Sequence, residues 1–188
     1  MLGAGVQARS HLEALRLVRK FERVRIFSPT AEHAQSLAAE AGAEAVETAE
    51  EAVRGADVVV TATSSVEPVL ERDWLKKGAH VNVIGGRPPT MRELDTATIA
   101  HSAFFVDRRE SAEAEAFDYR DALEAWAIGP DHIRAEIGEV LIGEKPGRSA
   151  PDELTVFRSL GLAVEDLAAA EYVVRRARET GAGTEVEF

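Results

Sequence analysis

The chain has 188 residues, a formal net charge of −11, 45% hydrophobic residues and no cysteine. The length predicts one domain with at most a short appendage, and the negative charge disfavours nucleic acid and anionic membranes as partners. Disulfides and thiolate metal sites are excluded, and no apolar run is long enough to span a membrane. Because residues 1–10 also lack a signal-peptide pattern, we expect a soluble, cytoplasmic protein.

Helical and strand-like spacing of apolar residues alternates from the start of the chain. Helices are expected at residues 6–20, at 30–41 and from 48, and strands at 24–27, 43–46 and 56–62. There follow a helical turn ending at 74–77, a strand at 79–84, a helix at 91–100 and a strand at 103–107. Helical patterns at 110–126 and 133–142, a loop at 143–152, a strand at 154–157 and a helix from 164 that ends before Gly181 complete the chain.

Strands separated by helices of this length predict an α/β fold with a doubly wound parallel sheet, of the Rossmann type that binds NAD(P). Residues 1–150 are assigned to this dinucleotide-binding domain and residues 151–188 to a C-terminal helical extension. Only Met1 and Leu2 precede the first glycine-rich turn, so the first strand is truncated. In the strand order 3-2-1-4-5-6 that strand is central, and its loss predicts unpaired neighbours and a need for a partner.

A G-x-G-x-x-A pattern opens the first helix. It consists of Gly3, Ala4, Gly5, Val6, Gln7 and Ala8. In this pattern the first glycine permits a tight turn, the second lets the backbone approach a pyrophosphate, and the small third residue lets the helix pack on the sheet. The helix N-terminus then holds the anion. The alternative is a glycine-rich start that binds no ligand.

Two further clusters follow predicted strands. At the end of the second strand, where NAD-binding proteins carry an acidic residue for the ribose, the chain has Ser28, and Thr30 adds a second hydroxyl. This favours NADP over NAD, although the same residues can serve as a turn and helix cap. Thr61, Ala62 and Thr63 end the strand at 56–62, where they either contact ribose or nicotinamide or cap the strand.

Metal binding and hydrolytic chemistry find no support in the sequence. The five histidines are scattered without metal-ligand spacing, and we expect them at the surface or bonded within the fold. They are His11, His33, His80, His101 and His132. No G-x-S-x-G nucleophile motif is present.

Five stretches resemble the ornithine cyclodeaminase/mu-crystallin family. They are GAGVQARSHLEAL (3–15), ADVVVTATSSVEPVL (56–70), WLKKGAHVNVIGG (74–86), PTMRELD (89–95) and TVFRSLGLAVEDLAAA (155–170). The resemblance implies a Rossmann domain and an N-terminal domain for dimerisation and substrate binding, to which the C-terminal segment returns. This chain corresponds to the Rossmann domain and that return alone. The family includes cyclodeaminases, ketimine and pyrroline-carboxylate reductases, alanine dehydrogenases and thyroid-hormone-binding mu-crystallins.

The resemblance also assigns residues. A family loop reading G-G-D-x-P-G-K corresponds here to Gly85 and the six residues after it, with Arg87 in place of the catalytic aspartate and Met91 in place of the lysine. Without that carboxylate, water attack on an iminium has no general base, so cyclodeaminase chemistry is not expected. Arg87 either contacts the substrate carboxylate or cofactor, or is a surface residue. Gly85, Ser159 and Leu160 are assigned to the cofactor site, the latter two near the nicotinamide.

Three functions remain open. The first is an NAD(P)-dependent reductase of a small imino acid, or the reverse amino-acid dehydrogenase, in which the cofactor supplies the hydride. The second is a truncated, non-catalytic remnant that needs a partner chain. The third is a small-ligand binder of the mu-crystallin kind. A homo-oligomer or a partner chain that supplies the missing half is expected in each case, because helices at the C-terminus are left exposed.

Overall fold

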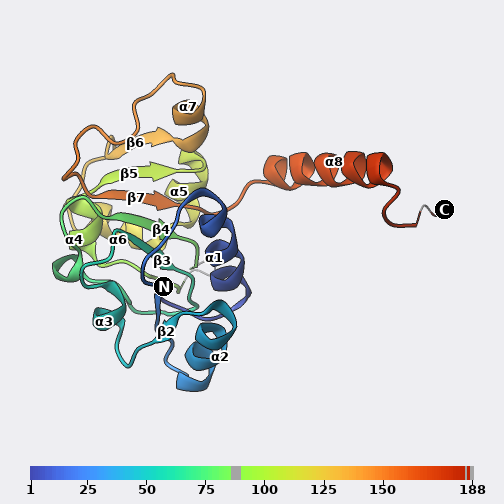
Figure 1. Cartoon of the computed structure of the whole chain (residues 1–188). Helices are drawn as coiled ribbons and strands as arrows, with labels where there is room; N and C mark the ends of the chain where they lie inside the picture. Colours follow the sequence, from blue (N-terminus) through green and yellow to red (C-terminus); the bar gives the residue numbers. More distant parts are fainter. Residues whose placement is uncertain (86–89, 185, 187–188) are drawn as a thin grey trace.

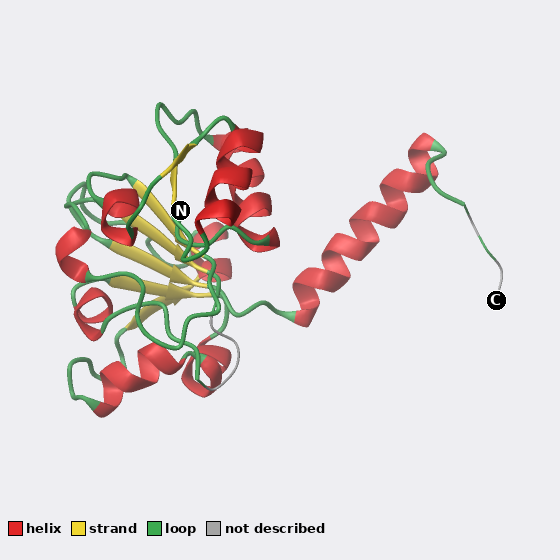
Figure 2. Ribbon diagram, turned by 90° about the horizontal axis from the view of Figure 1, so that it is seen from below, coloured by secondary structure: helices red, strands yellow, loops and turns green. Residues whose placement is uncertain are grey.

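A parallel sheet forms the centre of the molecule, with helices on both of its faces (Figures 1 and 2). The structure is a computed structural model that describes residues 1–85, 90–184 and 186. Its strands are β1 (Arg25–Ile26), β2 (Glu44–Ala45), β3 (Val58–Thr61), β4 (His80–Val83), β5 (Ala103–Val106), β6 (Ile133–Glu136) and β7 (Thr155–Arg158). Five of them form one sheet in the order β3-β4-β7-β5-β6, with every pair parallel. The predicted α/β class is therefore confirmed.

Most helices lie where local signals place them. They are α1 (Val6–Val18), α2 (Ala31–Ala41), α3 (Ala49–Val53), the 3-10 turn η1 (Arg72–Trp74), α4 (Thr96–Ala100), α5 (Arg109–Glu115), α6 (Phe117–Glu124), α7 (Ile137–Leu141) and α8 (Ala163–Thr180). Thr48 and Glu51 form a reciprocal capping box at the start of α3. Gly42 and Gly181 end α2 and α8 in the left-handed conformation that glycine adopts without strain.

Leu2 occupies the place of the expected first strand and bridges two parts of the sheet. β1 and β2 form a two-stranded parallel ribbon, and Leu2 makes isolated bridges to Phe27 beyond β1 and to Thr61 in β3. The Leu2 amide donates to the Val60 carbonyl at 2.8 Å, and the Leu2 carbonyl accepts from Ala62 at 2.8 Å. One residue therefore connects the ribbon to the main sheet in the expected central position, so the neighbours are paired there.

The C-terminal part of the chain differs from the expected division. β7 lies inside the main sheet between β4 and β5, so this sheet extends past residue 150. After β7 the chain leaves the body and forms α8, which projects away from the sheet (Figures 1 and 2). No residue of α8 is buried. Among the described residues, no helix is long and apolar enough to cross a membrane.

Three predicted helices are wrong in part. Residues 133–136 form β6 rather than the start of a helix, because Ile133 and Ala135 alternate into the core beside β5. Apolar residues at 133, 137 and 141 keep a helical spacing across the whole segment. The predicted helix at 91–100 begins only at Thr96, where the Asp95 carboxylate accepts from the Thr98 amide at 2.9 Å. The pattern at 110–126 divides into α5 and α6 at Ala116.

The core lies on both sides of the sheet. All four residues of β5 are buried, as expected for a parallel strand covered on both faces. Phe104 is fully buried and its ring stacks on Tyr119 of α6 with centroids 5.4 Å apart. A second cluster under α1 and α2 contains Leu12 and Leu37. Packing of this kind fixes the strand ends, which carry the site described next.

Candidate functional site

A cleft of about 690 Å³ opens at the carboxyl ends of β1 and β3, beside Leu2. It is lined by Leu2, Gly3, Ala4, Gly5, Val6, Gln7, Phe27, Ser28, Pro29, His33, Ala62, Thr63, Ser64, Ser65 and Val69. From Leu2 the chain adds β1 and β2 on one side and β3 and β4 on the other, so the cleft lies at the topological switch point. Doubly wound folds bind ligands at this point. The predicted glycine-rich segment, Ser28, Ala62 and Thr63 all come together here.

The turn from Leu2 into α1 has the geometry of an anion site. Gly3 has φ +103°, and a Cβ on it would lie 2.3 Å from the Ala62 carbonyl oxygen, so the turn requires glycine. A Cβ on Gly5 would meet nothing within 4 Å, which leaves open space beside the backbone. Gly5 is the N-cap of α1, no side chain caps this end, and the first turn has no acidic residue. The first-turn N–H groups are thus available to a phosphate, and the residues present fit a dinucleotide.

The end of β1 forms the second wall of the cleft. Ser28 lines it, and its Oγ accepts from the Thr30 amide at 3.4 Å. Thr30 is the N-cap of α2, as the helix-cap alternative expected, but its side chain makes no capping hydrogen bond and it does not line the cleft. His33, on the first turn of α2, does line it. His33 is one of the histidines expected at the surface or bonded within the fold, and its position just after a strand end is the sequence signal for its place in the cleft.

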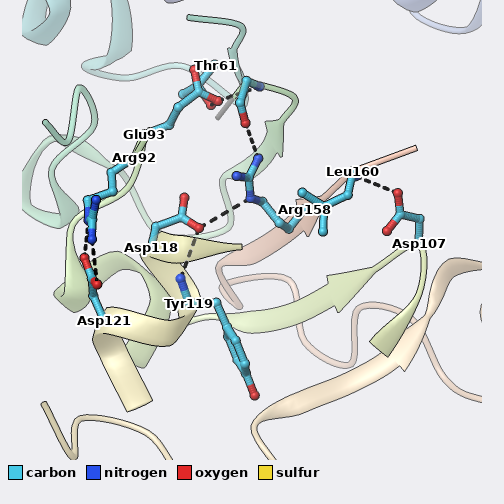
Figure 3. A network of polar contacts seen from close by, with 10 residues as sticks. Thr61, Arg92, Glu93, Asp107, Asp118, Tyr119, Asp121, Arg158 and Leu160 are labelled. Carbon is cyan, nitrogen blue, oxygen red and sulfur yellow. Dashed lines mark hydrogen bonds and ion pairs between the residues drawn. The ribbon is translucent and has the colours of Figure 1, made fainter. Parts of the chain in front are cut away.

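Glu93 is a buried carboxylate that joins the ends of β3 and β4, and sequence reasoning did not find it. It accepts from the Thr61 hydroxyl at 2.8 Å (Figure 3), from the Thr63 amide at 2.6 Å and from the Gly85 amide at 2.8 Å. Thr61 is fully buried and lies outside the cleft lining, so its hydroxyl serves the strand end rather than a ribose. Gly85 packs so closely that a Cβ would lie 2.1 Å from the Thr63 carbonyl oxygen.

Asp107, at the end of β5, organises the segment after β7. Its Oδ2 accepts from the amides of Leu160 and Gly161 at 2.6 and 2.5 Å (Figure 3 shows the Leu160 contact). The Ser159 amide donates to the Val83 carbonyl of β4 at 2.9 Å. Ser159 and Leu160 therefore lie at the carboxyl edge of the sheet but not in the cleft lining, and their contact with a nicotinamide stays a prediction.

Two ion pairs brace the same edge. Arg158, at the end of β7, and Asp118 on α6 are both fully buried, with Nε and Oδ1 3.4 Å apart (Figure 3). Arg158 also donates to the Gly85 carbonyl. Arg92 pairs with Asp121, which raises the pKa of Arg92 through that hydrogen bond and ties the segment before Glu93 to α6. These residues hold the strand ends in place.

The predicted catalytic residue, Arg87, lies outside the described residues, as do Gly86, Pro88 and Pro89. Its role stays a prediction. Within the described part of the chain, no group of three or more His, Asp or Glu side chains is placed to hold a metal ion.

Comparison with known proteins supports the resemblance found in the sequence. The family model described as "Ornithine cyclodeaminase/mu-crystallin family" matches residues 1–181. The mouse protein named ketimine reductase mu-crystallin is 42% identical over 175 residues, which cover 92% of this chain and 53% of that protein.

Solved structures of reductases are also similar to this chain. The Thermococcus litoralis Δ1-pyrroline-2-carboxylate reductase in complex with NADH and L-proline superposes with a TM-score of 0.92 at 36% identity, covering 98% of this chain and 59% of that chain. The Paracoccus denitrificans iminosuccinate reductase in complex with NAD+ superposes with a TM-score of 0.88 at 33% identity, covering 100% and 59%. The chain thus spans little more than half the length of these relatives. Over that span, it belongs to the ornithine cyclodeaminase/mu-crystallin family.

Proposed function

We propose that this chain is the dinucleotide-binding part of a nicotinamide-dependent imine reductase. The substrate class is a ketimine or pyrroline carboxylate, or an amino acid in the reverse direction. The observation that carries the proposal is the cleft at the switch point, whose glycine turn, open helix N-terminus and hydroxyl-bearing walls suit a dinucleotide. Relatives that cover this chain are named as reductases of this class and are solved with NADH or NAD+.

In this proposal, different residues of the chain bind different parts of the cofactor. The backbone amides of the turn from Gly3 to Gln7 receive the pyrophosphate at the positive end of α1. Ser28 faces the adenosine side, and Ala62 and Thr63 form the opposite wall. When bound, the nicotinamide supplies the hydride.

The buried carboxylates and Arg158 are positioning residues in this proposal. Glu93 fixes the ends of β3 and β4, and Asp107 fixes the segment that contains Ser159. Their hydrogen bonds keep the edge of the sheet rigid, which a hydride transfer requires because small misplacements of the reacting atoms cost large factors in rate. Arg87 is our candidate for contact with the substrate carboxylate.

We further propose NADP(H) as the cofactor. The described residues that line the cleft include no Asp or Glu, so no carboxylate there repels a 2′-phosphate. An NAD-specific site of this fold places an acidic side chain on the ribose hydroxyls instead.

The exposed face of α8, we propose, packs against another polypeptide. Apolar side chains on α8 are exposed, among them Leu167 at 69% and Val173 at 62%. An isolated amphipathic helix is marginal in water, and its apolar face favours packing against another chain. A second copy of this chain or a partner that supplies the substrate-binding half satisfies this requirement.

A non-catalytic nucleotide or small-ligand binder is the second candidate. It is favoured by Arg87 in place of the family's aspartate. Both candidates share the dinucleotide cleft and differ in turnover.

Thermal unfolding of the purified chain with NADPH, NADH or neither tests the proposal. A ligand at 100 times its dissociation constant adds about 2.7 kcal/mol of stability, which is easily measured. A shift followed by oxidation of NADPH in the presence of Δ1-pyrroline-2-carboxylate supports the reductase. A shift without turnover favours the binder, and no shift with either dinucleotide overturns both.

A further inference from the structure

The projecting helix α8 carries one apolar stripe along its whole length. The stripe consists of Ala163, Leu167, Ala170, Val174 and Ala177. Its residues follow one another at alternating steps of four and three, which keeps them on one face of the helix and is the spacing of helices that pair side by side. Four of the five are exposed and Ala177 is half-buried, so the body of the chain does not cover this face.

The stripe alternates between small and larger side chains. An alanine recurs every seven residues, and Leu167 and Val174 stand between the alanines. In a parallel pair of identical helices each position faces its own copy, so alanine meets alanine and leaves gaps between the layers of leucine and valine. In an antiparallel pair each larger side chain faces an alanine, and all layers have a similar volume. The order of sizes therefore favours an antiparallel pair.

The charges of α8 favour the same arrangement. The acidic residues of its first half are Glu165, Asp166 and Glu171, and the charged residues of its second half are Arg175, Arg176, Arg178 and Glu179. An antiparallel pair places the negative half of one helix beside the positive half of the other, whereas a parallel pair places like charges together. The surface of α8 is thus complementary, in size and in charge, to a second copy of itself.

The base of α8 is fixed to the body, and the rest of the helix is accessible. Asp107 accepts hydrogen bonds from the amides of Leu160 and Gly161, just before the helix begins. From there α8 leads away from the sheet (Figure 1). Its 18 residues span about 27 Å. Antiparallel pairing along this length keeps the two bodies at opposite ends of the helix pair, where they do not obstruct each other.

We propose that α8 is a dimerisation helix, which pairs antiparallel with α8 of a second copy of this chain through the stripe. The inference rests on the proposal above that α8 packs against another polypeptide, and it names that polypeptide. Both copies use the same face, so the assembly closes as a two-fold dimer. The contact is confined to one helix from each copy and is small for a specific interface, so we expect a dissociation constant in the micromolar range.

Sedimentation equilibrium of the purified full chain tests the pair. Ala170→Leu enlarges a small position of the stripe, where Val174 of the second copy packs. Ala169→Leu is the matched control, because it makes the same change one residue away on the outer face of the helix. Leucine is a good helix former, so both variants retain α8.

We expect the unmodified chain to form a dimer. Ala170→Leu raises its dissociation constant about tenfold, because overpacking of a close contact is destabilising, and Ala169→Leu leaves it unchanged. If the contact were hydrophobic without a fixed fit, the added apolar area of leucine at position 170 would strengthen it instead.

Cross-linking determines the direction of the helices. The chain has no cysteine, so Val164→Cys and Arg178→Cys each introduce a single thiol, at sites about 21 Å apart along α8. Both sites lie on the same flank of the stripe. In an antiparallel pair a short bis-maleimide joins the two variants when they are mixed, and it joins neither variant to itself.

Three results overturn the proposal. One is a dimer that Ala170→Leu strengthens or leaves unchanged. Another is cross-linking within a single cysteine variant, which indicates a parallel pair. The third is a chain that stays a single copy at all concentrations, in which case another polypeptide covers α8. None of them bears on the dinucleotide cleft, because thermal unfolding of the same samples with NADPH reports on that site separately.

Discussion

Substitution of Glu93 by glutamine tests whether one buried carboxylate holds the edge of the cleft. Glu93 is fully buried, and its two oxygens together accept three hydrogen bonds, from the Thr61 hydroxyl and the amides of Thr63 and Gly85. Glutamine has nearly the same shape but only one acceptor oxygen. Whichever way the amide is oriented, its NH₂ group faces a backbone N–H, that of Thr63 in one orientation and that of Gly85 in the other. One backbone donor is therefore left unsatisfied.

The expected cost follows from these bonds. A buried hydrogen bond to a charged group contributes about 1.5–3 kcal/mol, and an unsatisfied buried donor costs about 1–3 kcal/mol. Because the two terms overlap in one bond, we expect Glu93→Gln to lower the free energy of unfolding by roughly 2–4 kcal/mol. Urea unfolding followed by circular dichroism measures it.

Thr61→Val is the matched control, since it removes only the hydroxyl contact at similar volume and should cost about 1 kcal/mol. If Glu93→Gln costs no more than Thr61→Val, the carboxylate does not brace the two strands and the reasoning is refuted.

Three further predictions concern the turn, the opposite edge of the sheet and α8. Gly3→Ala should abolish dinucleotide binding in calorimetry and lower the melting temperature, because a Cβ there lies 2.3 Å from the Ala62 carbonyl oxygen at φ +103°; retained affinity would contradict the turn geometry. Burial lowers the pKa of His80 from its ordinary value of 6.5, so as the pH falls the unfolded chain takes up this proton before the folded chain does. The contribution of neutral His80 to the free energy of unfolding is therefore complete above pH 6.5 and declines as the pH falls below it. His80→Gln should flatten that decline in urea titrations between about pH 5 and 7, whereas an unchanged slope would assign it to other groups. Leu167→Asp on the exposed face of α8 should reduce the mass measured by light scattering towards that of a single chain, and an unchanged mass would place the contact elsewhere.

Local patterns were enough to predict which residues meet at the switch-point cleft but not the complete sheet. The glycine turn and the strand ends at Ser28 and Thr63 are short-range features that can be recognised from the residues next to them in the sequence. The place of β7 between β4 and β5 depends on pairing across 75 residues, from His80 to Thr155. The local periodicity of apolar residues carries no information about pairing between residues so far apart in the sequence. β6 was missed because a four-residue strand leads directly into α7, and the apolar spacing continued across both.

The buried polar groups were equally inaccessible from sequence. Glu93 stands 32 residues after Thr61, in a segment whose helical pattern hid its extended conformation, and nothing local marks a carboxylate as fully buried. Nothing local distinguishes Asp118 and Arg158 from surface charges, yet they form a pair without solvent exposure. His33 is the exception, since its position after a strand end is visible in the sequence.

The contacts that hold the edge of the cleft in the described part of the chain are made within this chain, so we expect the shape of the cleft to be independent of assembly. Glu93, Asp107 and Arg158 join the ends of four adjacent strands through hydrogen bonds to their own sheet and its loops. α8 has no buried residue and leads away from that edge. A change on α8 should therefore alter the oligomeric state while leaving the NADPH dissociation constant unaltered. A change at Glu93 should weaken NADPH binding through Thr63, whatever the oligomeric state. If instead Leu167→Asp also abolished nucleotide binding, the cleft would depend on a second polypeptide for its shape, and the crevice could not be the self-contained structure that its buried bonds indicate.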